Sequence, residues 1–346
     1  MISVITIDDE DKWDFIVKSF KNYDVYYLSG YTKAFKIHGD GEPLLFYYNN
    51  DEIRAINVAM KRDIEKDKNY EGKIVTEKLF DLTTPYGYGG FLFEGAINNE
   101  SLSKLNKVYS EYCNSNSIVS EFVRLHPILR NSTANKNIYE VTDLGKTITM
   151  DLITKEQIWE DLSSKNRNVI RKAIKSGVEI YWGRSPFLVD KFMLLYNATM
   201  DRDEATDYYY FDKDFYISVL EDLRYNSLFF YAVYKQKIIS MSMILFGNNS
   251  MHYHLSASDS KYKSLASTNL LLFEAACWGC ENRYDFFHLG GGLGSQEDNL
   301  FKFKKAFNKS SETYFSIGKK IFNQERYDEL INIRNNEEGF NIETSF

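Results

Sequence analysis

A lysine-rich segment near the C-terminal end of the chain is the first candidate for chemistry. Residues 298–308, DNLFKFKKAFN, fit a helix at about 100° per residue, with Leu300, Phe303 and Phe307 on one face. Lys304 falls at the edge of this face, between Leu300 and Phe301, so we expect a partly desolvated ammonium held in one direction. A fixed cation of this kind stabilises the negative charge that builds on a carbonyl oxygen during acyl transfer. The competing interpretation is a lysine whose stem covers a core helix while its charge reaches water.

Three glycines precede this helix and follow the strand-like run YDFFHL. Gly290, Gly291 and Gly292 allow a sharp turn off a buried strand, because glycine accepts positive φ, and they also allow a substrate close to the backbone. His288 stands two residues before Gly290 and is a second candidate for substrate contact. The sequence lacks a G-x-x-x-x-G-K-[ST] pattern, so a phosphate loop of that type is not predicted.

Two histidines occupy alternate positions of the strand-like segment MHYHLSASD. His252 and His254 are separated by Tyr253, so both are expected on one side of the strand. Either could take the proton of an attacking amine as a general base. The alternative is a half-buried polar strand face. No carboxylate partner for the two histidines is evident, and Cys277 and Cys280 form a lone CxxC inside a helical pattern, so no metal site is predicted.

Two arginines lie on the predicted helix SKNRNVIRKAIK, which Ser163 or Ser164 can cap and Gly177 can end. Arg167 and Arg171 flank the apolar stripe of Val169, Ile170, Ala173 and Ile174, and a guanidinium so placed can grip a phosphate through two hydrogen bonds. The alternative is a solvated basic face.

A second polar segment, MDRDEATDYYYF, mixes charges with tyrosines. Arg202, Tyr209 and Tyr210 combine polar and aromatic groups that suit a sugar or a peptide ligand. A loop that packs onto a core would use the same residue types.

Length and composition limit the alternatives. The chain has 346 residues, which favours two domains, and a net charge of −7, so any RNA contact would need local basic patches. The three cysteines argue against a disulfide framework. The acidic N-terminus does not resemble a signal peptide and no apolar run is long enough to cross a bilayer, so we expect a cytoplasmic protein without a membrane span.

The order strand, strand, strand, helix, strand is predicted twice. The first copy comprises a hairpin at 42–60, a strand at 86–95, a helix at 102–113 and a strand at 117–127. The second comprises a hairpin at 227–246, a strand at 251–259, a helix at 267–280 and a strand at 284–291. We therefore expect two α/β (α+β) domains, 1–147 and 148–317, each with a mixed, mostly antiparallel sheet flanked by helices. A last helix at 318–346 would join the first domain.

The second half resembles the GNAT acyltransferase fold in the order of its segments, from RNVIRKAIKSGVEI through HYHLSASD and STNLLLFEAACWG to DFFHLGG. With FHLGGGLGSQEDNLFKFKKAF, the tandem arrangement resembles the Fem family, whose members append amino acids to the peptide of peptidoglycan precursors. The resemblance implies two tandem GNAT-like domains. It also places a functional lysine at the second position of F-K-x-x-F, which is Lys304, and an acceptor-binding arginine in the region of Arg167 and Arg171.

The donor stays open between aminoacyl-tRNA and acetyl-CoA, neither bound permanently. GNAT enzymes hold the CoA pyrophosphate at a helix N-terminus through a loop of the form [QR]-x-x-G-x-[GA]. The corresponding residues here are Lys261-x-x-Ser264-x-Ala266, followed by Ser267 and Thr268, and the central glycine is missing. For tRNA, the basic clusters at 165–175 and 302–309 offer a local docking strip.

The expected function is transfer of an aminoacyl or acyl group to an amine of a cell-envelope precursor, from peptidoglycan or a surface polysaccharide. One alternative is an acetyl-CoA-dependent N-acetyltransferase that acts on a nucleotide-linked amino sugar. Another is a non-catalytic protein that binds a ligand with the same fold. Apart from tRNA as a possible donor, no nucleic-acid partner and no DNA are predicted, and oligomeric state is left open.

Overall fold

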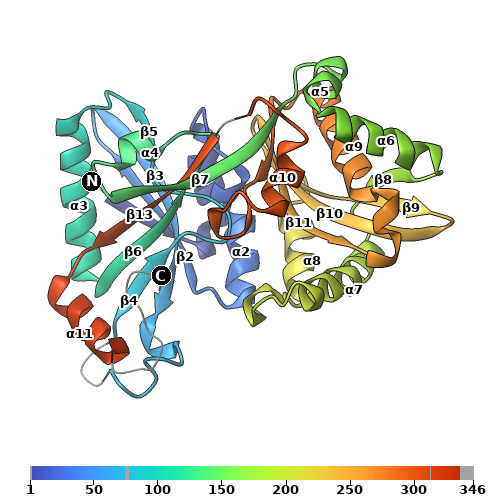
Figure 1. Cartoon of the computed structure of the whole chain (residues 1–346). Helices are drawn as coiled ribbons and strands as arrows, with labels where there is room; N and C mark the ends of the chain where they lie inside the picture. Colours follow the sequence, from blue (N-terminus) through green and yellow to red (C-terminus); the bar gives the residue numbers. More distant parts are fainter. Residues whose placement is uncertain (1, 75–77, 312, 336–346) are drawn as a thin grey trace. The chain divides into compact units, whose positions relative to one another are not determined.

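The computed structural model describes residues 2–74, 78–311 and 313–335, which form strands flanked by helices (Figure 1). These residues divide into two compact units. The first contains the described residues of Met1–Asn22, Tyr26–Asp143 and Ser316–Phe346, and the second contains Tyr23–Val25 and Leu144–Phe315. The sequence placed the main boundary after residue 147 and the return to the first domain at 318. The short segment Tyr23–Val25 was not expected in the second unit.

The first unit is built on a mostly antiparallel sheet. Its strands run in the order β1-β2-β3-β4-β6-β13, with β5 paired to β3, and only β4 and β6 are parallel. The strand bounds are β1 Ile2–Thr6, β2 Glu42–Asn49, β3 Ile53–Asp63, β4 Phe80–Thr83, β5 Leu92–Gly95, β6 Ile118–Leu125 and β13 Thr313–Ile321. The hairpin expected at 42–60 is the β2–β3 pair.

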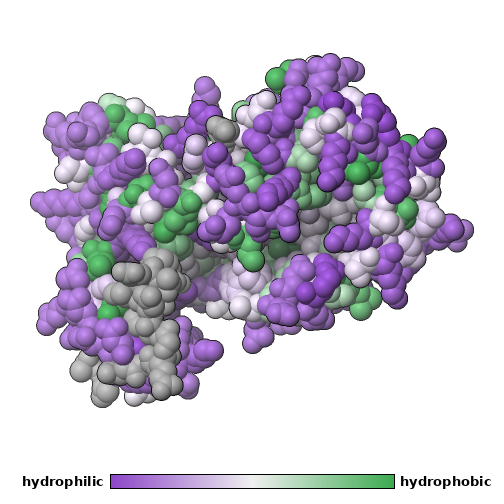
Figure 2. Space-filling model, viewed as in Figure 1, coloured by the Kyte–Doolittle hydropathy of each residue, from purple (hydrophilic) through white to green (hydrophobic). Residues whose placement is uncertain are grey.

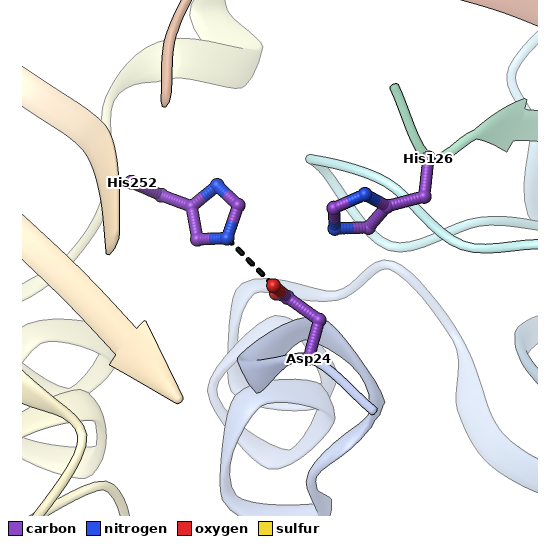
Figure 3. Close-up of side chains that lie close together, drawn as sticks. All are labelled: Asp24, His126 and His252. Atoms are coloured by element: carbon purple, nitrogen blue, oxygen red, sulfur yellow. Dashed lines mark hydrogen bonds and ion pairs between the residues drawn. The ribbon is translucent and has the colours of Figure 1, made fainter. Parts of the chain in front are cut away.

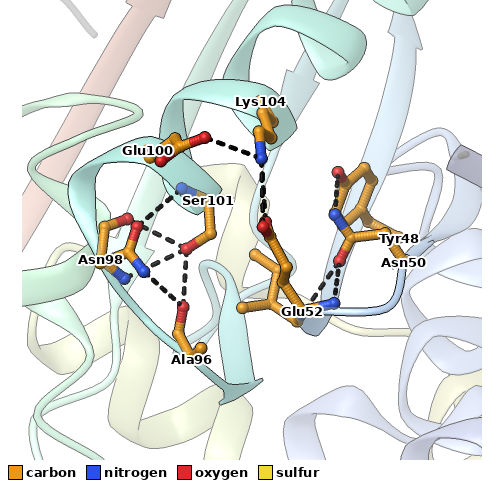
Figure 4. A network of polar contacts seen from close by, with 9 residues as sticks. Tyr48, Asn50, Glu52, Ala96, Asn98, Glu100, Ser101 and Lys104 are labelled. Carbon is orange, nitrogen blue, oxygen red and sulfur yellow. Dashed lines mark hydrogen bonds and ion pairs between the residues drawn. The ribbon is translucent and has the colours of Figure 1, made fainter.

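The helices of the first unit are α1 Glu10–Ser19, α2 Ser29–His38, α3 Asn99–Ser115, α4 Ser132–Asn135 and α11 Gln324–Asn335, with short 3-10 turns at Ile7–Asp9, Val25–Tyr27 and Ile64–Lys66. Helix α3 begins with a capping box. The Asn98 side chain accepts from the Ser101 N–H at 3.0 Å, and the Ser101 hydroxyl accepts from the Asn98 N–H at 3.1 Å (Figure 4). The helix then buries Leu105 and Tyr109 in the core of this unit.

A carboxylate lies inside the core of the first unit. Glu121 accepts hydrogen bonds from Asn57 Nδ2 and from the Tyr109 hydroxyl, each at 2.8 Å. Burial raises the pKa of Glu121, and the hydrogen bonds from Tyr109 and Asn57 oppose that rise. The satisfied oxygens explain how a carboxylate is accommodated in an apolar core.

The second unit has its own sheet, in the order β7-β12-β11-β10-β9-β8. Its strands are β7 Glu140–Asp151, β8 Glu179–Gly183, β9 Ser227–Tyr234, β10 Lys237–Gly247, β11 Ser250–Ser258 and β12 Phe286–Gly290. All neighbours are antiparallel except β11 and β12, which are parallel. Each unit therefore has the mixed, mostly antiparallel α/β architecture expected from the repeated order of segments, and the predicted fold class is confirmed.

Helices cover both faces of the second sheet, with α6 and α9 on one side and α7 and α8 on the other (Figure 1). The helices are α5 Lys155–Asp161, α6 Ser164–Lys175, α7 Pro186–Arg202, α8 Lys213–Asp222, α9 Ser267–Glu281 and α10 Asn299–Lys305, with 3-10 turns at Asp207–Tyr209, Ser260–Leu265 and Leu293–Ser295. Ser163 caps α6 by accepting from the Asn166 N–H at 3.2 Å. Gly177 follows with φ +85°, so both expected helix signals are confirmed.

The last predicted helix begins later than expected. Residues 318–321 belong to β13, and the helix runs over Gln324–Asn335, while 336–346 lie outside the described residues. The predicted helix began at Gly318 because a glycine often marks the boundary of a helix, whereas here it lies within a strand. A Cβ at Gly318 would lie 2.8 Å from Val123 Cγ1 and 2.9 Å from Tyr139 Cβ, so close packing requires glycine there. Among the described residues, no helix is both long and apolar enough to cross a membrane.

Candidate active site

Three strands of the second unit place polar side chains in one row. His252 of β11 pairs in register with His288 of β12, and His288 pairs with Thr149 of β7. The preceding row, Met251, Phe287 and Met150, is buried in the apolar core of this unit. Because side chains alternate along a strand, the row of His252, His288 and Thr149 faces the opposite side of the sheet.

The parallel pairing of β11 and β12 is short. It covers three register pairs and ends at His252 and His288, although β11 continues to Ser258 and β12 to Gly290. Over residues 253–258 and 289–290, the described strands therefore have no ladder between them. Strand edges that part in this way leave backbone N–H and C=O groups able to pair with an extended ligand that carries amides.

A chain of hydroxyl groups continues the row. The His288 Nδ1 lies 2.9 Å from Thr149 Oγ1, which in turn lies 3.3 Å from Thr313 Oγ1. Thr147 Oγ1 lies 3.0 Å from the same Thr313 hydroxyl. All these groups except Thr313 are at least nine-tenths buried. The chain fixes the orientation of the His288 ring.

His252 has a buried carboxylate partner. Its Nε2 lies 2.8 Å from Asp24 Oδ2, and the side chains are 1% and 0% exposed (Figure 3). Figure 3 shows the Asp24 carboxylate pointing at the edge of the His252 ring. Asp24 belongs to the short segment Tyr23–Val25 of the second unit, more than two hundred residues away along the chain.

His254 occupies a different environment. The β10–β11 register pairs Met243 with Leu255 and Ile244 with Tyr253, so His254 is the extra residue of a β-bulge. Burial lowers the pKa of His254 to about 3, with a smaller contribution from the nearby His252. The simple alternation expected for His252 and His254 is therefore interrupted between the two.

Lys304 is the buried cation of this unit. It lies in α10, is 9% exposed, and donates from Nζ to the carbonyl oxygen of Gly291 at 2.7 Å. Burial lowers the pKa of Lys304 to about 8, and the charge of Asp298 partly offsets this. Its ammonium is thus held at the glycine turn that follows β12.

Helix α10 is fixed by Asp298, which accepts from the Phe301 N–H at 2.8 Å and from the Leu293 N–H at 3.2 Å. The buried face carries Phe301 and Lys304, whereas Leu300 is 42% exposed. Of the expected apolar face, Phe303 and Phe307 pack against the core, Phe307 from the turn after the helix, whereas the expectation for Leu300 was wrong.

The glycine turn is tightly packed. Gly290 has φ +80°, which a residue with a side chain rarely adopts. A Cβ at Gly291 would lie 2.9 Å from the Lys146 carbonyl oxygen, and a Cβ at Gly292 would collide with Gln296 and Asp298. The turn therefore brings backbone into contact with backbone, as the glycine pattern indicated.

The two arginines of α6 differ. Arg167 is half-buried, and its Nη1 donates to the carbonyl oxygens of Leu162 at 2.7 Å and Glu160 at 3.1 Å, at the end of α5. Arg171 is exposed and lies over the Trp159 ring, 5.0 Å from its centroid. Of the two guanidinium groups, that of Arg171 is more open to an anionic ligand.

The aromatic segment after α7 lies at the surface of the second unit. Arg202 is exposed and contacts Asp203 at 3.2 Å, and the Tyr210 hydroxyl donates to Asp201 at 2.8 Å. Tyr209 is half-buried and packs edge-on against Tyr208. These residues form a polar and aromatic surface without a buried charge.

The N-terminus of α9 has the backbone geometry of an anion site. Ala266, at its N-cap, has φ +51° and no side-chain acceptor, so the N–H groups of Ser267 and Thr268 are not capped by it. Ser264 lies in the preceding 3-10 turn, beside the exposed Lys261 and Lys263. The fifteen-residue α9 directs its positive dipole end at this turn.

The comparisons with known proteins agree with this geometry. Residues 164–304 match the model of an acetyltransferase (GNAT) domain. A crystal structure of FemX superposes with a TM-score of 0.69 at 15% identity, covering 95% of this chain and 99% of that one. The chain has the fold of FemX, and its second unit contains a GNAT domain.

Two further structures share this Fem-like fold. The C-terminal domain of a putative lysylphosphatidylglycerol synthetase from Agrobacterium fabrum has a TM-score of 0.56 at 11% identity, covering 95% of this chain and 96% of that one. L-PGS from Bacillus licheniformis has a TM-score of 0.53 at 11% identity, covering 87% and 89%. No curated protein sequence matches the chain. The GNAT domain supports acyltransferase activity in general and suggests an acyl-CoA donor.

The second unit also contains functional candidates that the sequence did not indicate. Asp24 stands in the segment FKNYDVYYLSGY, where no motif or spacing connects it to a histidine more than two hundred residues later. From the sequence alone, Thr149 is indistinguishable from other residues of a predicted strand. Only the register of β7, β12 and β11 brings it beside His288.

Proposed function

We propose that the protein is an acyltransferase that moves an aminoacyl or acyl group to an amine of a cell-envelope precursor. The observation that carries the proposal is the buried Lys304 ammonium, fixed on the Gly291 carbonyl within a GNAT domain. Burying a cation costs folding free energy unless a charged partner compensates it. At hydrogen-bond distance, Lys304 contacts a neutral carbonyl oxygen. A catalytic role would explain why this cost is tolerated.

In the proposed reaction, the acceptor amine attacks the carbonyl carbon of the donor and negative charge moves onto the carbonyl oxygen. Lys304, in its ammonium form, stabilises that oxygen. One such donor typically lowers the barrier by about 3–4 kcal/mol. The amine loses a proton to a histidine of the second unit, for which His252 and His254 are the candidates. The leaving sulfur or oxygen departs with the electron pair of its bond to carbon and is protonated.

The charges around the site and the fold support the proposed acceptor. Arg171 is the first candidate to bind an acceptor phosphate, and Arg167 is the second. His288, Gly290 and Gly291, at the end of β12 and the turn after it, are the candidates for substrate contact near Lys304. Arg202, Tyr209 and Tyr210 offer a further surface for a sugar or peptide. The Fem-like fold supports a nucleotide-linked peptidoglycan precursor or a surface-polysaccharide precursor as the acceptor.

Aminoacyl-tRNA as the donor is supported by the basic helix α6. Lys165, Arg171, Lys172 and Lys175 are exposed on it, and Figure 2 shows mostly hydrophilic side chains over α5 and α6. A cluster of this kind binds a phosphate backbone and makes binding sensitive to salt.

Acetyl-CoA is the second candidate donor, and it is favoured by the uncapped N-terminus of α9. The N–H groups at Ser267 and Thr268, with Ser264 and the αL residue Ala266 in the turn before them, can hold a pyrophosphate. The corresponding function is an N-acetyltransferase that acts on a nucleotide-linked amino sugar.

The proposal is tested by following label transfer from two donors to purified acceptors. Radiolabelled aminoacyl-tRNA and acetyl-CoA are each incubated with a nucleotide-linked peptidoglycan precursor and with a nucleotide-linked amino sugar. We expect amide-linked product with one donor. Binding of an acceptor without transfer from either donor would instead support a non-catalytic ligand-binding protein.

A further inference from the structure

We propose that Asp24 is a positioning residue that makes His252, and not His254, the base that takes the proton from the acceptor amine. This inference rests on the proposed acyltransferase function. It assigns a role to a residue of the N-terminal part of the chain that contributes to the second unit through a three-residue segment.

The contact between Asp24 and His252 fixes the form of the imidazole. An ionised carboxylate only accepts hydrogen bonds, so the 2.8 Å contact requires the hydrogen on His252 Nε2. The lone pair then lies on Nδ1, where it can accept a proton. A carboxylate also stabilises the imidazolium that forms when the proton arrives.

Both partners are almost completely buried, which makes their mutual placement strict. Removing one partner of a buried pair typically costs about 3–5 kcal/mol, because the other charge is left uncompensated. Asp24 and His252 are 0% and 1% exposed, so solvent does not substitute for either group.

The segment that carries Asp24 is anchored on both sides. The Tyr23 carbonyl oxygen accepts from Asn248 Nδ2 at 3.2 Å, in the turn between β10 and β11. Val25 lies against Gly247, where a Cβ would be only 3.1 Å from the Val25 nitrogen. The carboxylate is therefore held against the same hairpin that carries His252.

His252 lies at the end of the short β11–β12 ladder. It forms the last register pair with His288 before β11 and β12 part, and the two rings lie 6.0 Å apart and nearly perpendicular. The proposed role places the acceptor amine in the gap beyond this pair, next to the His252 ring. Lys304 contacts Gly291, one residue beyond the end of β12.

His254 lacks this arrangement. It is the bulged residue of β11, and burial holds its pKa at about 3, so it stays neutral at physiological pH and holds a transferred proton poorly. The Nε2 of His252, by contrast, lies 2.8 Å from the Asp24 carboxylate.

The proposed step conserves atoms and charge. The amine nitrogen forms a bond to the acyl carbon and gives one proton to His252 Nδ1. The bond from the acyl carbon to the donor sulfur or oxygen breaks, and its electron pair leaves with that atom. His252 then returns the proton to the leaving atom, and the Asp24 carboxylate remains ionised throughout.

The test compares Asp24→Asn with the wild type by kinetics and by NMR of the imidazole nitrogens. The amide NH₂ of asparagine can donate to Nε2, which moves the ring hydrogen to Nδ1 and removes the base. We expect kcat to fall by about 10²–10⁴-fold, as for the loss of an orienting carboxylate in other enzymes, with KM little changed. Long-range ¹H–¹⁵N spectra should show the Nε2–H form of His252 in the wild type and the Nδ1–H form in the variant.

Glu121→Gln is the matched control, because it also neutralises a buried, hydrogen-bonded carboxylate but lies in the core of the first unit. It should leave kcat and the His252 spectrum unchanged. If Asp24→Asn does not fold, His252→Gln decides the matter, since the glutamine amide can still donate to Asp24 but cannot act as a base. A fall in kcat of about 10²-fold or more supports the inference.

The outcomes separate this inference from the proposed function. An active wild type together with an unchanged kcat in Asp24→Asn, or in His252→Gln, overturns the role of Asp24 and leaves the acyltransferase proposal standing. A wild type that transfers no acyl group from either donor contradicts the proposed function, and the base role fails with it.

Discussion

The Lys304 ammonium donates to the carbonyl oxygen of Gly291 over 2.7 Å, and this single contact joins helix α10 to the turn after β12. The lysine is only 9% exposed. An incoming substrate oxygen can compete with the Gly291 carbonyl for the same ammonium. The hydrogen bond thus fixes the position of the ammonium without neutralising its charge.

Replacing Lys304 by methionine should remove this cation while keeping most of the side-chain volume. We expect kcat to fall by about 10²–10³-fold, the usual effect of losing one donor to a developing oxyanion. Lys302→Met is the matched control, because Lys302 lies on the same helix but is exposed. Equal rates for the wild type and Lys304→Met would rule out the oxyanion role.

The pH dependence of catalysis should report the same lysine. Burial lowers the pKa of Lys304 to about 8, so the cation is lost as the pH rises through that value. We expect kcat/KM to decline above about pH 8 in the wild type. In Lys304→Arg, any remaining activity should persist to higher pH, because a guanidinium stays protonated. A profile whose alkaline limb is identical in the wild type and in Lys304→Arg assigns that limb to another group.

The stability of the fold should depend on pH through Lys304 in a defined direction. An unfolded lysine has a pKa of about 10.4, so between about pH 8 and 10.4 the unfolded chain binds more protons at this residue than the folded chain does. The free energy of unfolding attributable to Lys304 therefore rises with pH in that window, by at most about 1.4 kcal/mol per pH unit. Urea unfolding of the wild type and Lys304→Met at several pH values measures the difference. A difference that is constant between pH 8 and 10 would show that Lys304 titrates normally.

The arginines of α6 should separate into a structural and a binding residue. Arg167→Ala removes donors to the carbonyl groups at the end of α5 and should lower the free energy of unfolding by about 1 kcal/mol or somewhat more. Arg171→Ala should change stability by less than about 1 kcal/mol, because the residue is exposed, and should raise KM for a phosphate-bearing substrate. Thermal unfolding and initial rates on both variants make the comparison, and a raised KM only in Arg167→Ala reverses the assignment.

Glycine at 292 should be required for α10 to keep its position. A Cβ there would collide with Gln296 and with the Asp298 carboxylate that caps the helix, so Gly292→Ala should displace the cap and lower both stability and kcat. Gly294→Ala is a milder control, since a Cβ there meets nothing within 4 Å and only its φ of +56° opposes the change, at about 1 kcal/mol. Normal kinetics in Gly292→Ala would show that Lys304 tolerates movement of its helix.

Local sequence signals predicted much of this fold. The paired hairpins, Ser163 as the cap of α6, Gly177 after it and the buried setting of Lys304 follow from periodicity and from capping chemistry, which act within a few residues. Strand β13 was misread as a helix because the need for Gly318 arises from Val123 and Tyr139, which lie far away in the sequence.

The candidate site was predicted only in part, for the same reason. Lys304, His252 and His288 could be singled out by residue type and spacing, but the contacts that define their chemistry join residues distant in sequence. The partner of His252 is Asp24, and the partner of His288 is Thr149. Likewise, the role of Arg167 depends on the end of α5 and not on its own helix.

We propose that the protein transfers an acyl group to an amine, with the buried Lys304 of its GNAT domain stabilising the oxyanion. The most direct measurement is transfer of radiolabel from aminoacyl-tRNA or from acetyl-CoA to a nucleotide-linked envelope precursor, with the wild type and Lys304→Met run side by side. We expect the wild type to form an amide-linked product. We expect Lys304→Met to form it at a rate at least about 10²-fold lower. Absence of product with both donors and both acceptors, or equal product from the wild type and Lys304→Met, would contradict the proposal.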